Sequence, residues 1–277
     1  MAQIVGGFCV PHDPAATAFP ELGDRRKVRA VLDGFAHVAR RITELKADTC
    51  IVIGDDHYAL FGPHCLPNFL IAIGDIEGPE EPWLRIDRYA IENNVPLAEH
   101  IMNYGFEHGF DWCVAKSLTL DHGTMVPVHL AVTPAKGVRT IPIYTASGVA
   151  PLLRTRRAVQ LGRMIGDAVA AFPGNDRVVV MGTGGLSHWV GMAEMGKVNE
   201  RFDREVLGHV LGGDADALAA LSDEYVLEQG GNGAFEIRNW IVAMAAMPGQ
   251  VRGEMICYEP IPEWITGLGL TELKSAA

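Results

Sequence analysis

Short apolar, β-branched runs alternate with amphipathic helical patterns along this chain, and that alternation restricts the possible fold more than any other feature. The strand-like runs lie at 3–10, 49–54, 68–73, 111–115, 139–144, 177–181 and 251–258. The helical patterns lie at 24–46, 96–108, 152–172, 197–221 and 234–246, and residues 126–132 fit either a strand or a helix. Strands that alternate with helices form a sheet with helices packed on it. We therefore predict an α/β fold with a mixed, mostly parallel central sheet flanked by helices on both faces.

One long interruption of this pattern lies at residues 74–94, where proline, glycine and acidic residues gather. We predict a long loop there, and long loops in compact domains often serve as lids or binding elements. The sequence shows no internal repeat and no low-complexity linker. Since 277 residues suit one large domain, we expect a single domain over 1–277.

Acidic residues outnumber basic residues by 34 to 23, which gives a formal net charge of −11. This balance argues against a phosphate-neutralising surface, so we expect no nucleic-acid partner. Five scattered cysteines without a CxxC pair fit a reducing compartment. Because the sequence shows neither a signal peptide nor an apolar run of about 20 residues, we expect a cytoplasmic protein with no membrane partner.

Histidines follow several of the predicted strands. His12, His57 and His188 come after β-branched runs, and His122 lies in the turn Asp121-His122-Gly123. In open α/β sheets, ligands bind beyond the carboxyl ends of the strands, and imidazole is both a common metal ligand and a proton shuttle. We therefore expect one site assembled from distant parts of the chain, although each histidine alone also fits an ordinary turn.

Acidic residues lie beside two of these histidines. Asp55 and Asp56 precede His57 and can hold its imidazole in one tautomer. Asp121 precedes His122 in the same way, which suits a proton-transfer residue. Both patterns also fit capped turns.

A carboxylate completes a possible ligand set. Glu236 follows a glycine-rich stretch and begins an otherwise apolar helix, where it also fits a residue that interacts with the helix dipole. With His12 and His57 it gives two imidazoles and one carboxylate, which suits non-haem Fe(II). Zinc takes the same ligands, so the ligand set leaves the metal open. The glycine-rich segment 182–188 matches neither a dinucleotide fingerprint nor a phosphate loop.

Five blocks, taken in order, resemble the class III extradiol ring-cleavage dioxygenases, of the type of the catalytic β subunit of protocatechuate 4,5-dioxygenase. The blocks are His12 after the first strand, GDDHY at 54–58, LDHGTMVP at 120–127, GTGGLSH at 182–188, and GNGAFEIRNWIVAMAAM around Glu236. Each block alone is common, whereas five in the family's order are specific. The resemblance covers nearly the whole chain, and it implies an enzyme that incorporates both atoms of O₂ into an aromatic diol.

Carried onto this sequence, the resemblance implies Fe(II) held by His12, His57 and Glu236. It implies that His188 is the acid/base that takes a proton from a catechol hydroxyl, and that His122 lines the oxygen side of the pocket. The implied substrates are protocatechuate, gallate, substituted catechols or dihydroxypyridines.

Three further residues near the C-terminus are candidates for binding the substrate: Thr266, Arg238 and Trp264. We expect a homo-oligomer, and relatives that use a small accessory subunit make such a partner a second expectation. Two alternatives stay open, a zinc-dependent hydrolase that uses the same histidines and glutamate, and a non-catalytic partner subunit on the same fold.

Overall fold

The computed structural model describes residues 1–275. Its strands are β1 (Gln3–Val10), β2 (Thr49–Asp55), β3 (Phe69–Gly78), β4 (Tyr89–Ile91), β5 (Cys113–Thr119), β6 (Arg139–Thr145), β7 (Arg177–Thr183), β8 (Val251–Ile261) and β9 (Thr266–Ser275). Within the described range they form one nine-stranded sheet in the order β4-β3-β6-β2-β7-β1-β9-β8, and β5 pairs with β3 beside this path.

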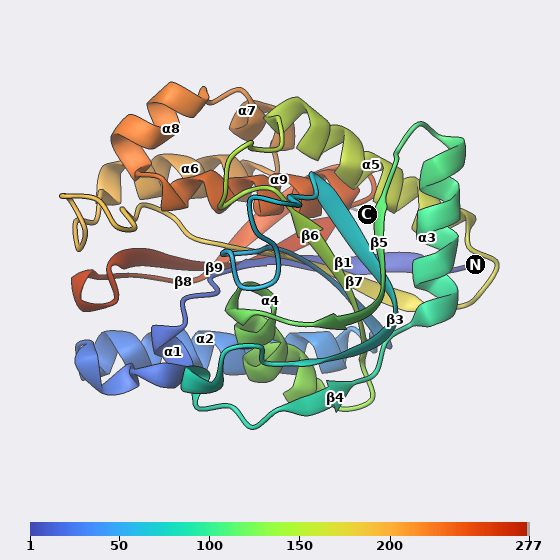
Figure 1. Ribbon diagram of the computed structural model, residues 1–277, viewed down its shortest axis with the longest axis horizontal. Coiled ribbons are helices and arrows are strands. Elements are labelled where there is room, and N and C mark those ends of the chain that lie inside the picture. Colours follow the sequence, from blue (N-terminus) through green and yellow to red (C-terminus); the bar gives the residue numbers. More distant parts are fainter. Residues whose placement is uncertain (276–277) are drawn as a thin grey trace.

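Helices cover both faces of this sheet. They are α1 (Ala15–Ala18), α2 (Arg25–Glu44), α3 (Val95–Glu107), α4 (His122–Pro127), α5 (Thr155–Ala171), α6 (Glu200–Gly212), α7 (Ala215–Ala219), α8 (Asp223–Gly230) and α9 (Ile237–Ala246). Figure 1 shows α5 to α9 on one side of the sheet, and α1, α2 and α4 on the other. Among residues 1–275, every helix falls short of the length and apolarity needed to cross a bilayer.

Parallel pairing dominates the centre of the sheet. β6, β2, β7 and β1 are parallel neighbours, and β5 is parallel to β3. The pairs β3–β4, β3–β6, β1–β9 and β8–β9 are antiparallel. The prediction of an α/β fold with a mixed sheet and helices on both faces is confirmed. The sheet is less parallel than predicted, since the described strands form four parallel pairs, mostly at the centre, and four antiparallel pairs toward the flanks.

Strand β2 shows why the central runs are apolar throughout. All seven of its residues are buried. Ile51 and Ile53 belong to the core on the α5 and α9 side, whereas Cys50 and Val52 belong to the core on the α2 side. Successive side chains of a strand point to opposite faces, so a sheet with helices on both faces selects an unbroken hydrophobic run.

The structure corrects the predicted loop at 74–94. Residues 74–78 extend β3, and Tyr89–Ile91 forms the short edge strand β4. Ile76 accounts for the extension, because it is buried and pairs with Ile91 on one side and Leu118 on the other. The irregular segment is therefore shorter, and we refer to residues 79–88 as the loop segment. Strand β9, which no sequence pattern predicted, lies between β1 and β8.

Candidate metal centre

The carboxyl ends of the parallel strands meet at one edge of the sheet, and the histidines predicted there come together. β1 ends two residues before His12, and β2 ends two residues before His57. β7 ends at Thr183, before the loop that carries His188. Because β1, β7 and β2 are parallel neighbours, their carboxyl ends place these three imidazoles at the same edge.

Glu236 lies at the centre of this cluster. It ends the short 3₁₀ turn Gly233–Glu236 that leads into α9. One carboxylate oxygen, Oε2, lies 3.1 Å from Nε2 of His12, and the other, Oε1, lies 3.3 Å from Nε2 of His57. Nε2 of His188 lies 3.6 Å from Oε1. The structure thus brings three histidines with predicted roles around the carboxylate of Glu236.

The hydrogen bond of His12 reveals which ring nitrogen is free. Its Nδ1 lies 3.0 Å from the hydroxyl of Thr183, and that hydroxyl donates its own hydrogen to the carbonyl of Gly123 at 2.7 Å. A hydroxyl has one hydrogen to donate, so Thr183 accepts from Nδ1–H of His12. The lone pair of His12 is therefore on Nε2, which faces Glu236.

His57 has the same arrangement. Its Nδ1 donates to Oδ2 of Asp121 at 3.1 Å, and Asp121 also accepts from the hydroxyl of Tyr144 at 2.9 Å. Nε2 of His57 then faces Glu236, and Oδ2 of Asp55 lies 3.7 Å away from it. A carboxylate that holds Nδ1 in this way fixes the tautomer of a metal-ligating histidine.

These donor atoms fit a metal ion. Two imidazole lone pairs and a carboxylate oxygen repel one another at such distances, unless a proton or a cation lies among them. Ligand atoms of His12, Asp55, His57 and Glu236 all lie within 4.8 Å of one another. In addition, Oδ2 of Asp55 is buried without a hydrogen-bond partner. Two imidazoles and one carboxylate suit Fe(II) or zinc.

The charges of the cluster also favour a cation. Burial alone would raise the pKa of Glu236, but His12 and His188 hold that pKa well below its ordinary value. Burial alone would lower the pKa of His57, but Asp55, Asp121 and Glu236 raise it well above its ordinary value. Without a metal, these carboxylates therefore keep a proton on His57. A divalent cation would supply the same compensation and release that proton.

Two glycines make room for this geometry. Gly184 has φ +145°, and a Cβ there would lie 2.7 Å from Cβ of Glu236. A Cβ on Gly233 would lie 2.0 Å from Nε2 of His188. A side chain at either position would displace Glu236 or His188, which explains why glycines flank both residues in the sequence.

A comparison with known protein families now identifies the chain. A family model described as the catalytic LigB subunit of aromatic ring-opening dioxygenase matches residues 6–269. The chain belongs to this family. The resemblance inferred from the five sequence blocks is confirmed, and with it the prediction of an extradiol ring-cleavage dioxygenase.

Individual relatives agree with this membership. A 2,3-dihydroxyphenylpropionate/2,3-dihydroxicinnamic acid 1,2-dioxygenase from Photorhabdus laumondii subsp. laumondii is 27% identical, over 96% of this chain and 96% of that protein. The enzyme of the same name from Rhodococcus sp is 27% identical, over 90% of this chain and 92% of that protein. The crystal structure of uncharacterized protein JW3007 from Escherichia coli K12 aligns with TM-score 0.61 at 10% identity, over 97% of this chain and 99% of that chain. The last comparison shows a shared fold.

In this ring-opening dioxygenase, His188 is held from several sides. Its Nδ1 lies 3.0 Å from the carbonyl of Leu186, and its backbone forms a bridge with Thr266 of β9. The preceding Ser187 donates its backbone N–H to Asp203 at 2.7 Å. A carbonyl accepts and cannot donate, so Nδ1 carries a hydrogen, and Nε2 is the nitrogen that faces Oε1 of Glu236. Of the predicted substrate-binding residues, Thr266 is thus the one that lies beside the cluster.

Three other predicted residues make their contacts elsewhere. Asp56 accepts backbone N–H groups from the four residues Tyr58, Ala59, Leu60 and Phe61, so it shapes the loop after His57. Arg238 is buried, pairs with Asp223 and donates to the carbonyl of Leu153 at 2.7 Å. Trp264 belongs to the core on the α2 side.

The sequence did not point to three residues that hold the site together. They are Thr183, Asn239 and Glu81. Asn239 donates to Asp55 at 2.6 Å and to the carbonyl of Thr183 at 2.9 Å. Glu81, from the loop segment, accepts from Nδ1 of His122 at 2.6 Å. The glutamate pair in the predicted loop was the available signal for Glu81, and it did not say which acid would turn inward.

His122 completes the cluster on the side of the loop segment. It begins α4, and its ring centroid lies 4.1 Å from that of His57 and 5.9 Å from that of His12. The exposed indole of Trp83 lies 6.1 Å from His122, centroid to centroid. The structure therefore unites all five residues predicted to act as ligands or catalysts.

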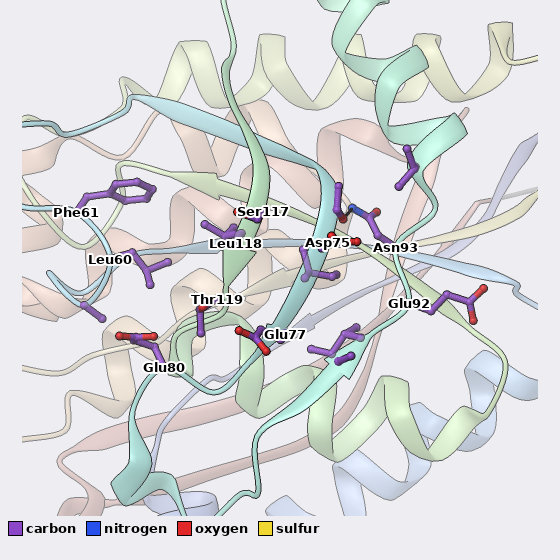
Figure 2. A pocket seen from close by; sticks show the side chains of 16 residues that line it. Leu60, Phe61, Asp75, Glu77, Glu80, Glu92, Asn93, Ser117, Leu118 and Thr119 are labelled. Carbon is purple, nitrogen blue, oxygen red and sulfur yellow. Dashed lines mark hydrogen bonds between the residues drawn. The ribbon is translucent and has the colours of Figure 1, made fainter.

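A separate hollow of about 710 Å³ lies against β3, β4 and β5 (Figure 2). Its rim carries acids and its walls carry apolar and hydroxyl side chains, including Asp75, Glu77, Glu80, Glu92 and Leu118. The clustered histidines and Glu236 are not among its lining residues. We place the chemistry at the cluster, because the hollow lacks its converging nitrogen donors.

Proposed function

We propose that this ring-opening dioxygenase binds Fe(II) through His12, His57 and Glu236 and opens the ring of a catechol-type substrate with O₂. The observation that carries the proposal is the convergence of two Nε2 atoms on one buried carboxylate. Bound iron would hold both diol oxygens and mediate electron transfer from the ring to O₂. Both oxygen atoms would then enter the ring-opened product.

The chain's own residues would handle the protons. We assign to His188 the removal of a proton from a substrate hydroxyl, since its Nδ1 is held by the carbonyl of Leu186 and its Nε2 faces the cluster. A neutral imidazole is well matched to this transfer near neutral pH. We assign to His122 the side of the pocket where O₂ and the opened ring are steadied. Thr266, beside His188, would contact the substrate.

The names of the relatives support one substrate class. The relatives from Photorhabdus and Rhodococcus are named for 2,3-dihydroxyphenylpropionate and 2,3-dihydroxycinnamic acid. We propose a catechol with a substituent next to the diol as the first substrate to test, ahead of protocatechuate, gallate and dihydroxypyridines. Five free thiols in the described residues support a reducing cytoplasm as the place of action. A single domain, a homo-oligomer and a small accessory subunit stay predictions.

Oxygen uptake tests the proposal. The protein is loaded anaerobically with Fe(II) or with zinc and mixed with 2,3-dihydroxyphenylpropionate, protocatechuate or gallate. We expect O₂ consumption in equal amount to a yellow ring-opened product with the iron-loaded protein alone. The zinc-loaded protein is the matched control, because the ligands accept both metals. Retained iron without uptake from any of these diols would contradict the proposed substrates, and activity with zinc alone would contradict the metal.

A further inference from the structure

Glu81 is a buried acid that the loop segment carries to His122. Its Oε1 lies 2.6 Å from Nδ1 of the His122 ring, and its Oε2 lies 3.0 Å from the backbone nitrogen of the same residue. Both oxygens of one carboxylate thus contact one histidine. Nothing in the proton transfers described above requires this double contact.

We propose that Glu81 is the positioning residue of His122, and that it fixes both the tautomer and the direction of this ring. A carboxylate accepts hydrogen bonds and does not donate them. The contact at Oε1 therefore places the hydrogen on Nδ1 and leaves the lone pair on Nε2. The inference rests on the proposed function in one respect, namely that His122 faces the bound reactants.

The contact at Oε2 fixes the backbone as well. His122 is the first residue of α4, and the side chain of Asp121 does not cap this helix because it binds His57 and Tyr144. Glu81 accepts the free N–H of His122 in its place. Holding the ring and its own backbone to one carboxylate removes the rotation that would otherwise let the imidazole turn away.

The source of this partner distinguishes His122 from the other three imidazoles. Nδ1 of His12 contacts Thr183, at the end of β7. Nδ1 of His57 contacts Asp121, just before α4, and Nδ1 of His188 contacts the carbonyl of Leu186, in the loop after β7. The partner of His122 comes from the loop segment. Its orientation consequently depends on the seating of that segment.

The loop segment is seated against the region after His12. Trp83 stacks on Phe19 with ring centroids 6.4 Å apart and an interplanar angle of 12°. Arg85 pairs with Glu21 at 2.9 Å. These contacts lie within a few residues of Glu81, so they help to keep its carboxylate at His122.

Glu80 offers a matched control. It is the neighbour of Glu81 on the same segment, yet it lines the hollow near β3 and β5 (Figure 2). Its carboxylate is 42% exposed and lies 4.0 Å from Arg88. Glu80→Ala therefore removes a carboxylate one residue away from Glu81 and leaves the contacts of His122 in place.

The test measures the ring of His122 directly. Protein labelled with ¹⁵N-histidine is compared as wild type, Glu81→Ala, Glu81→Gln and Glu80→Ala, metal-free and loaded with zinc, with His122→Gln used to assign the signal. We expect wild type and Glu80→Ala to show Nδ1–H with an unprotonated Nε2. Glu81→Ala should show both tautomers and faster exchange of the His122 backbone amide. Glu81→Gln should restore part of the wild-type pattern, because its amide oxygen still accepts a hydrogen bond.

Turnover supplies a second readout. In the iron-loaded protein, Glu81→Ala should lower kcat by about 10–100-fold, with KM and iron content unchanged, and Glu80→Ala should match wild type. Unchanged ring signals and amide exchange in both Glu81 variants would overturn the proposal, whatever happens to kcat. If the wild-type protein cleaves none of the diols, but the imidazole signals of His122 respond to the Glu81 substitutions as expected, the proposed function fails and the positioning role stands.

Discussion

The two sides of the cluster are built differently. One side is carried by the ends of central strands and the start of α9, which hold His12, His57, His188 and Glu236. Except for His57, each of these residues is at least nine-tenths buried. The opposite side consists of the loop segment and the region after His12. There the aromatic side chains are open to solvent, since Trp83 is 45% exposed and Phe19 is 39% exposed.

This contrast suggests a division of tasks. Donor atoms on strand ends are fixed by a sheet that has a core on each face, and fixed donors suit a metal whose geometry must not change. Side chains on a loop tolerate substitution and insertion. We infer that the residues on the strand ends, the strand side, hold the metal and carry out the reaction. The loop segment and the region after His12, the loop side, determine which diols enter and how His122 is held.

Removing a strand-side ligand should have the largest effect. In Glu236→Ala, two imidazoles without a carboxylate hold Fe(II) poorly, so we expect loss of bound iron and of essentially all turnover. Iron per chain is measured by mass spectrometry after anaerobic loading and gel filtration. Glu80→Ala is the control, since it removes a carboxylate from the hollow. Iron retained at the wild-type level in Glu236→Ala would remove this residue from the ligand set.

The next effect should come from the strand-side base. His188→Ala should keep its iron and lose about 10²–10⁴-fold in kcat, the range for a general base. His108→Ala is the control, because His108 is exposed at the end of α3 and contacts Tyr104. Near-normal turnover of His188→Ala would exclude it from proton transfer.

On the loop side, a change at Trp83 should alter affinity more than chemistry. Trp83→Ala removes the ring nearest His122 from the loop side, and we expect KM for a substituted catechol to rise about 3–10-fold while kcat changes little. Trp264→Phe is the contrast, because Trp264 is buried in the core, and it should lower Tm without changing KM. If the two substitutions act alike on KM, the proposed division between the two sides is wrong.

The last change concerns the support of His188 and acts on stability, so its effect on turnover should be the smallest. Burial raises the pKa of Asp203 from 3.8 to about 6, against the lowering influence of the N–H of Ser187 and the hydroxyl of Tyr258. An acid whose folded pKa is raised binds its proton more tightly in the native state, so stability falls as pH rises from about 4 to about 6. Asp203→Asn removes this dependence. Its unfolding free energy relative to wild type should therefore rise by up to about 3 kcal/mol between pH 4 and pH 7.

Urea unfolding at several pH values measures this difference. Asp216→Asn is the control, because Asp216 is exposed in α7 and pairs with Arg163. Its difference from wild type should stay nearly constant over the same range. A constant difference for Asp203→Asn as well would show that Asp203 is not a buried charge at neutral pH.

The sequence was most informative where chain order determines position. His12 and His57 could be placed because each follows an apolar run, and parallel strands end at a common edge. The Nδ1 partners of His12 and His122 depend on contacts between distant segments, so no pattern marked Thr183, and the pair of glutamates in the loop did not say which one would contact His122. On α9 the sequence did not give the rotation of the helix about its axis. That rotation turns Asn239 toward Asp55 and leaves Arg238 against Asp223. Strand β9 was missed because its glycines and mixed polarity hide the alternation expected of a strand.

The place of β9 has a consequence for synthesis of the chain. Gly7 and Cys9 of β1 pair with Leu273 and Thr271 of β9, and Thr266 of β9 borders His188. Ribosomes add about 5–20 residues per second, so an emerging β1 waits roughly 15–50 s for this partner. During that interval an apolar strand has an open edge, which favours binding by a chaperone. The metal cluster therefore acquires this neighbour only after residue 266 has been added.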